Sequence, residues 1–484
     1  MNRKKRSFEP LQPLDLGKCP TVDSIVQGMS KCSFGARMLG EATSTIEQMI
    51  RQSNPVLIYD GKSDTPLATL LKEMVEKRWF SGVKLPEEYA KKRGSKNIIV
   101  VGGYSERHEE ALYKKSERAV FINSFELAKP GQIRDGYFPD AVFNDPRFIM
   151  PLISASLDER LEGKKTTINQ FMGRLEKYRG LAESVARGAQ TLSAMVNNPE
   201  CTVFLTISGA MTIAQMGLVI CDMIDSDMVD YISTTGALIA HGLIEGVGLK
   251  HYKHDPQYDD AFLAKHKINR VTDTLEPETN FTHIVKVMDH VLEGFSGKTS
   301  ISPTLLHKKI GEYVAKTFPQ ERGMLKSAYE KEIPVFAPAF FDSEIGNDLY
   351  THNQLRSRQG KPKIRIDMEK DSASLIEMMT HAKRAGIFTI GGGVPRNNTQ
   401  NVAPLIEIMN DRLGTRLPEN QFFYGLRISP DRMHTGHLSG CTYDENKSWR
   451  KMDVHGRFSE IKSDATQIWP FLVKYVMEKK EPSA

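Results

Sequence analysis

A glutamate, a tryptophan and a lysine lie within seven residues of one another near the C-terminal end of the chain. They are Glu445, Trp449 and Lys451, in the run ENKSWRK, shortly after a glycine-containing turn at 438–441. A lysine packed against an aromatic ring loses its proton more easily because burial disfavours the charged form, and the neutral amine is a nucleophile. The glutamate could hold a cationic substrate beside it. The segment therefore predicts amine chemistry at Lys451.

Glycine-containing turns follow several short apolar segments. Gly391–Gly393 follow the apolar run 387–390, and similar turns stand at Thr234–Gly236 and Ser208–Gly209. Glycine lets a backbone approach a phosphate closely and donate amide protons to it. A single turn of this kind is more often structural than functional. Because the carboxyl ends of parallel strands meet at one edge of a sheet, the set of turns predicts a ligand crevice.

Two aspartates and two histidines complete the polar candidates. Asp342 and Asp464 could bind ribose hydroxyls or a nicotinamide amide, although a helix cap or turn is the more common role for each alone. His434 and His437 form an HxxH pair, but no carboxylate or cysteine stands at ligand spacing from them. We therefore predict no metal site.

Apolar runs of strand length alternate with helical patterns through most of the chain. This alternation predicts an α/β fold, with a parallel sheet that is covered by helices on both faces. The tail, 465–477, predicts a closing helix, and the polar stretch 352–372 predicts a surface loop. The main predicted strands are 203–207, 228–233, 333–336, 387–390 and 422–428.

A second strand-and-helix region lies earlier in the chain. Its predicted strands are 55–59, 97–101 and 119–122. The region has polar, charged edges, as linkers usually do, and predicts a separate α/β insert of unknown role. The predicted domains are therefore an N-terminal helical segment of the main domain at 1–50, the insert at 51–180, and the main domain at 181–484.

Composition excludes several classes of protein. The net charge of +5 is too small for a chain of 484 residues to indicate nucleic acid binding. No apolar run is long enough to span a bilayer, and no secretory signal follows the basic start, so we expect neither a membrane nor a nucleic acid partner. Five dispersed cysteines without metal-site spacing are typical of free thiols in a reducing compartment. We expect a cytoplasmic location.

With these residues assembled, the chain resembles the deoxyhypusine synthase family. The resemblance runs from about 201 to 476 and includes a further piece at 21–50, whereas 51–180 has no counterpart. It implies a doubly wound, Rossmann-like fold that binds NAD. It also implies a homotetramer with active sites between subunits.

The resemblance further implies a transferase that uses polyamines. In such enzymes NAD takes a hydride from spermidine, the aminobutyl group forms an imine on a lysine, and the group passes to an acceptor amine. The acceptor is a lysine of translation initiation factor 5A in deoxyhypusine synthases, where hypusine synthesis begins. It is putrescine in relatives that make homospermidine.

The resemblance assigns roles to individual residues. Lys451 matches the imine-forming lysine, Trp449 the aromatic wall, and Glu445 a carboxylate of the polyamine pocket. The other substrate-binding positions are Ser448, Asn397, His241 and Asn347. The cofactor-binding positions are Thr235, Gly236, Asp342, Gly391, Gly392, Gly393, Asp464 and Ala465.

Several pocket positions depart from the family pattern. His241, Asn347 and Leu438 stand where the family has carboxylates, and Asn397 stands where it has a histidine. Since a buried ammonium without a carboxylate is costly, ordinary spermidine binding is in question. Two alternatives stay open: a small-molecule transferase of the homospermidine synthase kind, and a catalytically silent subunit that pairs with an active paralogue. Retention of Lys451 with Trp449 favours an enzyme.

Overall fold

The computed structural model describes residues 8–59, 65–85, 88–89, 97–102, 112, 116–123 and 141–480. The chain forms two compact units. The large unit comprises Met1–Pro13, Gly188–His254 and Tyr258–Ala465, and the small unit comprises Leu14–Arg187, Asp255–Gln257 and Thr466–Ala484. The main boundaries between the units follow Pro13, Arg187 and Ala465, whereas the predicted domain boundaries follow residues 50 and 180.

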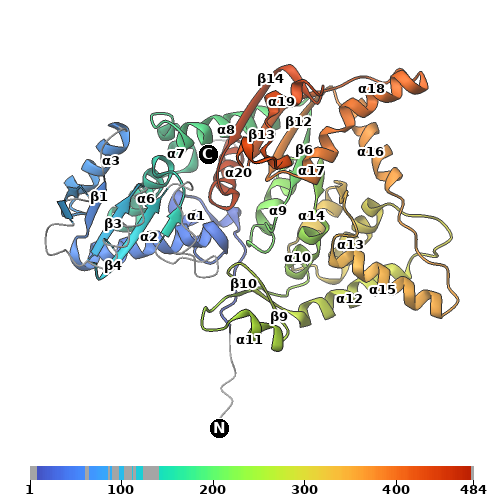
Figure 1. Ribbon diagram of the computed structural model, residues 1–484, viewed down its shortest axis with the longest axis horizontal. Helices are drawn as coiled ribbons and strands as arrows, with labels where there is room; N and C mark the ends of the chain where they lie inside the picture. The colour runs from blue at the N-terminus through green and yellow to red at the C-terminus, as the bar shows by residue number, and fades with distance from the viewer. Residues whose placement is uncertain are drawn as a thin grey trace, which may run out of the picture. The chain divides into compact units, whose positions relative to one another are not determined.

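A six-stranded sheet forms the centre of the large unit, and all its neighbouring strands are parallel. Its strands lie in the order β11-β7-β6-β12-β13-β14, which is 3-2-1-4-5-6 when they are counted along the chain. This is the strand order of the doubly wound dinucleotide-binding fold. The predicted α/β class with a mostly parallel sheet is confirmed, and Figure 1 shows β6, β12, β13 and β14 side by side. The strands are β6 (Cys201–Ile207), β7 (Tyr231–Thr234), β11 (Val335–Phe336), β12 (Arg384–Ile390), β13 (Phe422–Ile428) and β14 (Met452–Ile461).

Helices cover both faces of this sheet, which explains why its central strands are continuous apolar runs. Phe204 and Ile387 point to one face and belong to a core cluster that includes residues of three later helices. On the other face, a Cβ at Gly188 would lie 2.6 Å from Ile461 Cδ1, so the helix that contains Gly188 packs tightly on β14. The helices of the large unit are the second half of α8 (Leu181–Val196), α9 (Gly217–Asp225), α10 (Gly236–Gly246), α12 (Glu278–Glu293), α13 (Pro303–Thr317), α14 (Met324–Glu330), α15 (Glu344–Arg358), α16 (Met368–His381), α17 (Val394–Gln400), α18 (Val402–Leu413) and α19 (Tyr443–Lys447).

A small antiparallel sheet lies between α10 and α12 in the sequence of the large unit. It has the order β8-β10-β9 and is accompanied by one short helix. The sequence analysis did not predict it, because its strands are only two to four residues long. The elements are β8 (Tyr252–Lys253), α11 (Asp260–Lys265), β9 (Ile268–Val271) and β10 (Thr274–Pro277).

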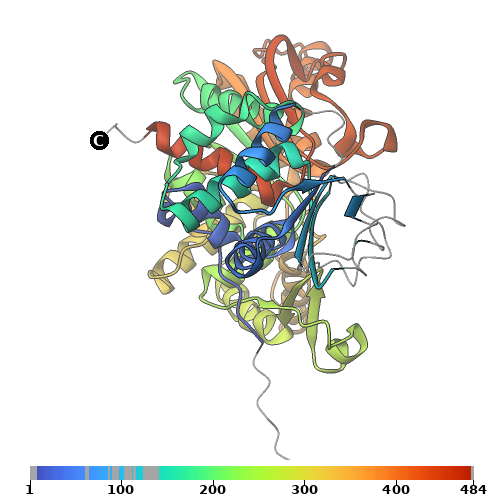
Figure 2. The same cartoon turned by 90° about the vertical axis from the view of Figure 1, so that its left-hand side faces the viewer.

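The small unit is built around a second parallel sheet, so the predicted additional α/β region is confirmed. Its order, β2-β1-β3-β4-β5, is the other common doubly wound order. Helix α2 packs along β3 and β4, as Figures 1 and 2 show. The strands are β1 (Val56–Tyr59), β2 (Val83–Lys84), β3 (Asn97–Val101), β4 (Arg118–Asn123) and β5 (Ala141–Phe143). The helices are η1 (Leu16–Lys18), α1 (Val22–Met29), α2 (Phe34–Ser53), α3 (Thr65–Glu76), α6 (Pro146–Glu162), α7 (Ile168–Leu175) and most of α20 (Ala465–Lys480).

The predicted surface loop at 352–372 is wrong. Helix α15 continues to Arg358 and α16 begins at Met368, so only the residues between these two helices lack helical structure. Leu349, His352 and Arg356 are buried although two of them are polar. Their spacing places them on one face of α15, which is enough to fix a helix in a polar sequence.

Two further expectations from the sequence concern the cysteines and membrane-spanning helices. All five cysteines are free thiols, as predicted. Within the described residues, no helix is both long enough and apolar enough to cross a bilayer.

Candidate active site

The carboxyl ends of the large sheet's strands are level with one another. Ile207, Ile390, Ile428 and Ile461 are paired in register across β6, β12, β13 and β14. Each residue that follows therefore emerges at the same edge of the sheet. Of the predicted cofactor segments, 391–393 comes directly after β12, and 464–465 begins three positions after the end of β14. Thr235 and Gly236 come directly after β7, whose Thr234 pairs in register with Ile207.

The strand order reverses between β6 and β12, and Ser208 joins the carboxyl ends of these two strands. The amide of Gly392 donates to Ser208 Oγ at 2.8 Å, and a Cβ at Gly391 would lie 2.5 Å from the same oxygen. In doubly wound sheets, ligands bind in the crevice at such a switch point. The glycine turn therefore lies where a dinucleotide site is expected.

The three glycines of this turn differ in backbone conformation and in the space beside them. A Cβ at Gly392 would lie 2.6 Å from Ser439 Cα, so glycine is required there for packing against the 438–440 turn. Gly393 has φ +76° and ψ −145°, a backbone region that glycine alone adopts without strain. A Cβ at Gly393 would meet nothing within 4 Å. Of the three, only Gly393 combines an unusual backbone with open space beside it.

Thr235 and Gly236 are brought next to the segment that contains Asp342. Thr235 Oγ1 caps α10 by accepting from Leu238 N at 3.2 Å. A Cβ at Gly236 would lie 2.5 Å from Ser343 Oγ, so the start of α10 packs against the residue that follows Asp342. Asp342 itself is exposed. The predicted cofactor residues of β7 and β11 are thus neighbours.

Asp464 and Ala465 stand between β14 and α20. Asp464 is half-buried and Ala465 is buried. Because Ile461 pairs in register with Ile428, this segment belongs to the same edge of the sheet as Ser429. The position agrees with the predicted cofactor edge.

Lys451 is buried and reaches the helix that follows the glycine turn. Its Nζ donates to Asn397 Oδ1 at 2.8 Å, and its side chain is 8% exposed. The amide of Asn397 in turn donates to the carbonyl of Gly393 at 3.0 Å. Asn397 therefore lies one helical turn, about 5.4 Å along the axis, beyond the glycine turn. These contacts bring the predicted nucleophile towards the predicted cofactor edge.

The surroundings of Lys451 favour a neutral amine. Burial lowers the pKa of Lys451, and the nearby Arg396 guanidinium lowers this pKa further. Arg396 is itself buried, donates to the carbonyls of Cys441 (2.9 Å) and Leu438 (2.8 Å), and is thereby fixed in place. Among the described residues, no carboxylate forms an ion pair with Lys451. A cation there would be both partly desolvated and unbalanced.

Three predicted substrate-binding residues precede Lys451 closely in the chain, and each has different surroundings: Trp449, Glu445 and Ser448. Lys451 Nζ lies 5.8 Å from the centre of the Trp449 ring, which is 66% exposed. Glu445 Oε2 accepts from Thr442 N at 3.3 Å in a capping box that starts α19, so this carboxylate has a structural partner. Ser448 lines an open pocket of about 470 Å³ that also contains Glu407.

His241 and Asn347 are not brought to Lys451 by any contact within the described residues. His241 lies six residues after Thr235 on α10, about 9 Å further along the helix, and its Nδ1 is 2.6 Å from Glu276 Oε2. Asn347 is exposed on α15. Their predicted place in a polyamine pocket stays a prediction.

Arg427 is a site residue that the sequence analysis missed. It is buried on β13, its Nη1 donates to Ser439 O at 2.7 Å, and its Nη2 pairs with Glu460 at 2.9 Å. Together with Arg396 it holds the 438–441 segment against α17 and the glycine turn. The only signal in the sequence was a single arginine inside an otherwise apolar strand.

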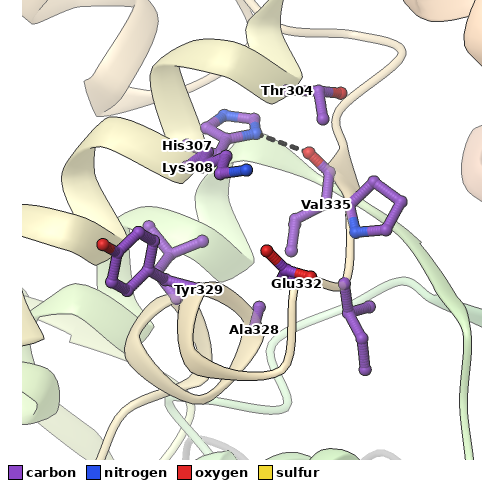
Figure 3. Close-up of a pocket in the computed structure, with 10 residues that line it drawn as sticks. Thr304, His307, Lys308, Ala328, Tyr329, Glu332 and Val335 are labelled. Atoms are coloured by element: carbon purple, nitrogen blue, oxygen red, sulfur yellow. Dashed lines mark hydrogen bonds between the residues drawn. The ribbon is translucent and has the colours of Figure 1, made fainter.

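A separate cavity of about 210 Å³ lies between α13, α14 and the start of β11 (Figure 3). His307 Nδ1 donates to Val335 O at 2.8 Å, and complete burial lowers the pKa of His307 to about 4, so the ring is neutral. Residues 333–335 enter this cavity just as β11 begins. The cavity is therefore at the amino end of the strand, away from the predicted cofactor edge, and no predicted site residue lines it.

The lowered pKa of Lys451 predicts an unusual pH profile for its reaction with aldehydes. Because a lower pKa leaves more amine unprotonated at any given pH, methylation by formaldehyde and cyanoborohydride should reach half its maximal rate at lower pH than at an exposed lysine such as Lys361. Peptide mass spectrometry across pH 6 to 10 measures both rates in one sample. Coincident profiles for the two lysines would contradict the proposed electrostatic effect.

Comparison with known proteins places the chain in a family. A family model described as deoxyhypusine synthase matches residues 171–476. "Probable deoxyhypusine synthase 2" of Methanosarcina mazei is 31% identical over 339 residues, which cover 69% of this chain and 91% of that protein. A "Deoxyhypusine synthase-like protein" of Chlorobaculum parvum is 30% identical over 301 residues, covering 62% of this chain and 83% of that protein.

A solved structure of a provisionally assigned deoxyhypusine synthase from Entamoeba histolytica aligns with a TM-score of 0.43 and 14% identity, covering 64% of this chain and 92% of that one. The family model covers more than half of the chain, and the Methanosarcina protein is matched over most of its length. The chain belongs to the deoxyhypusine synthase family.

Proposed function

We propose that this protein is a transferase that moves an aminobutyl or similar aminoalkyl group from a polyamine to an acceptor amine, with NAD as cofactor and Lys451 as the imine-forming residue. The observation that carries the proposal is the buried Lys451 amine, bonded to Asn397 one helical turn from the glycine turn. Its lowered pKa and lack of a carboxylate partner among the described residues suit a nucleophile rather than a structural ion pair.

The carboxyl edge of the large sheet fits a dinucleotide. Its strand order is that of dinucleotide-binding folds, and open space lies beside Gly393. The hydroxyl of Thr234, at the end of β7, is buried and has no hydrogen-bond partner among the described residues, which is rare unless a ligand or water completes it. The residues proposed to hold NAD are Thr235, Gly236, Asp342, Gly391, Gly392, Gly393, Asp464 and Ala465. When bound, NAD would accept a hydride from the carbon next to a polyamine nitrogen and return it after transfer.

Lys451 would then work as follows. Its neutral amine adds to the oxidised carbon of the donor, and the donor's remaining amine leaves with a proton, so that the aminoalkyl group is held as an imine on Nζ. The acceptor amine adds to the same carbon, and departure of Nζ restores Lys451. Asn397, whose Oδ1 accepts from Nζ, keeps the amine on the side of α17. The indole of Trp449 would exclude water from the imine.

The donor must be a cation at neutral pH, and several groups could bind it. Glu445 and Ser448 flank Trp449, and His241 and Asn347 are the remaining proposed pocket residues. Asp348 follows Asn347 on α15; burial, with smaller effects of Asp289 and Glu344, raises the pKa of Asp348 to about 6. That carboxyl is therefore mostly ionised at pH 7 and could hold an ammonium group.

Spermidine should nevertheless be a poor donor, because the family's carboxylates are replaced at Asn347 and Leu438. Restoring one charged contact is worth about 1.5–3 kcal/mol, or roughly tenfold or more in affinity. We expect Asn347→Asp with Leu438→Asp to lower the Michaelis constant for spermidine by at least tenfold. Leu413→Asp, at another exposed leucine, is the control. A low-micromolar constant for the unmodified protein would refute this expectation.

The acceptor is best identified by transfer of a labelled group. The purified chain is incubated with NAD and spermidine labelled in its aminobutyl part, together with either putrescine or a translation initiation factor 5A-like protein. Label in a new amine or on the protein supports the proposed transfer and names the acceptor class. Absence of label with both, when NAD binds normally, would overturn the proposal and favour the silent-subunit alternative. Assembly as a homotetramer, which family membership suggests, would provide a way to cover the exposed indole of Trp449.

A further inference from the structure

A buried cluster of histidines and glutamates lies in the large unit and has no part in the proposed transfer beyond the possible substrate role of His241. His241 Nδ1 is 2.6 Å from Glu276 Oε2, and His251 Nε2 is 3.5 Å from the same oxygen. One nitrogen or oxygen from each residue can be chosen so that all three lie within 4.8 Å of one another. The residues come from three segments: α10, the turn before β8, and β10.

One buried ring nitrogen of this cluster has only a long polar contact. His251 is 1% exposed, and its Nε2 faces Glu276 Oε2 at 3.5 Å, which is longer than a good hydrogen bond. Buried polar atoms of this kind are uncommon unless an ion or water completes them. Nε2 faces Glu276, whose side chain is also buried, and His241 is the only member of the cluster with some exposure. His251 Nε2 is therefore aimed into the cluster rather than into an apolar wall.

A second layer of polar groups orients the three side chains. On the opposite side of the His251 ring, Nδ1 is 3.7 Å from Glu245 Oε1, which can accept its proton. It is also 3.2 Å from Gln215 Nε2, an amide nitrogen that only donates. Asn280 Nδ2 lies 3.5 Å from the second oxygen of Glu276. Metal-binding histidines usually have a carboxylate or amide on their other nitrogen, and metal-binding carboxylates are themselves hydrogen-bonded.

We propose that His241, His251 and Glu276 bind a divalent transition metal of the zinc type. Two imidazole nitrogens and one carboxylate oxygen form a common ligand set for such ions, whereas magnesium and calcium prefer oxygen ligands. With metal–ligand bonds of about 2.0–2.2 Å, tetrahedral ligands lie about 3.4 Å apart. The His251–Glu276 pair, at 3.5 Å, has this separation already. The His241–Glu276 pair, at 2.6 Å, needs to open by less than about 1 Å.

The ion would tie α10 to the small antiparallel sheet. Helix α10 starts at the proposed cofactor edge with Thr235, and Glu276 lies on the central strand of the small sheet. The three protein ligands leave a fourth position, on the side where His241 is partly exposed. The site is separate from the HxxH pair His434 and His437, which belongs to an exposed loop. Binding should therefore stabilise the fold as well as fill the cluster.

The test uses the full-length chain after removal of bound metals with a chelator. Calorimetric titration with zinc chloride should show one ion per chain, and cobalt(II) should give the intense visible bands of a low-symmetry, four-coordinate site. Both results use the unmodified protein, so they do not depend on how a variant folds. No saturable binding below about 10 µM, or an octahedral cobalt spectrum, would overturn the proposal; His251 would then carry a proton in place of the ion.

Matched variants locate the ion. Glu276→Gln keeps the shape of the side chain but removes a charged ligand, and should weaken zinc binding at least 100-fold and abolish the zinc-dependent rise in melting temperature. The double variant His434→Ala with His437→Ala should bind zinc like the unmodified chain. Equal affinity in Glu276→Gln, or loss of binding in the loop variant, would contradict the assignment.

Discussion

Replacement of Lys451 by arginine should abolish aminoalkyl transfer, with a residual rate below about one-thousandth of the unmodified protein. Arginine keeps a long cationic side chain but stays protonated, so it cannot add to the oxidised donor carbon. The change also places a permanent charge in a site where burial and Arg396 already disfavour one. Transfer of labelled spermidine to an acceptor amine measures the loss.

Lys447→Arg is the matched control for this experiment. Lys447 lies four residues before Lys451 and pairs with Asp444 at 2.6 Å, a contact that arginine can also make. It should transfer at the unmodified rate. If Lys451→Arg retains more than about a tenth of the activity while Lys447→Arg behaves normally, Lys451 is not the imine-forming residue.

Gly393→Val should weaken NAD binding at least 100-fold. Valine at φ +76° and ψ −145° is strained by about 1–3 kcal/mol, so the turn must change shape, and its side chain would fill the open space beside the backbone. A 100-fold loss corresponds to about 2.8 kcal/mol. Calorimetric titration with NAD gives the affinity directly.

Gly414→Val controls for the general cost of such a substitution. Gly414 also has a positive φ, +66°, and a Cβ there would meet nothing within 4 Å, but it ends α18 rather than a strand of the cofactor edge. This variant should bind NAD normally. Gly392→Val is a poor test, because its side chain would strike Ser439 and disturb the 438–440 turn whatever binds there. Equal NAD affinity in Gly393→Val and the unmodified chain would place the cofactor elsewhere.

The sequence indicated much of the fold because its central strands are continuous apolar runs that end at glycine or polar turns. The runs 422–428 and 97–101 coincide with β13 and β3. β14 was missed for the opposite reason: only Met452 and Ile461, at its ends, are fully buried, and the residues between them include exposed His455 and Arg457. A strand at the edge of a sheet shares too little of the core to show an apolar pattern.

The candidate residues of the site could be named from the sequence, but most contacts between residues distant in the chain could not. The family resemblance placed Lys451, Trp449 and Asn397 in one pocket, and the contacts from Lys451 to Asn397 and to the Trp449 ring agree with that grouping. The packing of Gly392 on Ser439 could not be foreseen, because it joins residues 47 positions apart without any pattern between them. The pairing of His241 with Glu276 was hidden for the same reason.

The central claim is that the amine of Lys451 carries the transferred group. It is tested most directly by incubating the unmodified chain with NAD and spermidine or another polyamine, reducing with borohydride, and mapping the adduct by peptide mass spectrometry. We predict one NAD-dependent adduct, on Lys451, whose mass identifies the donated aminoalkyl group. An NAD-dependent adduct on another lysine, or none while the protein still transfers label, would contradict the account.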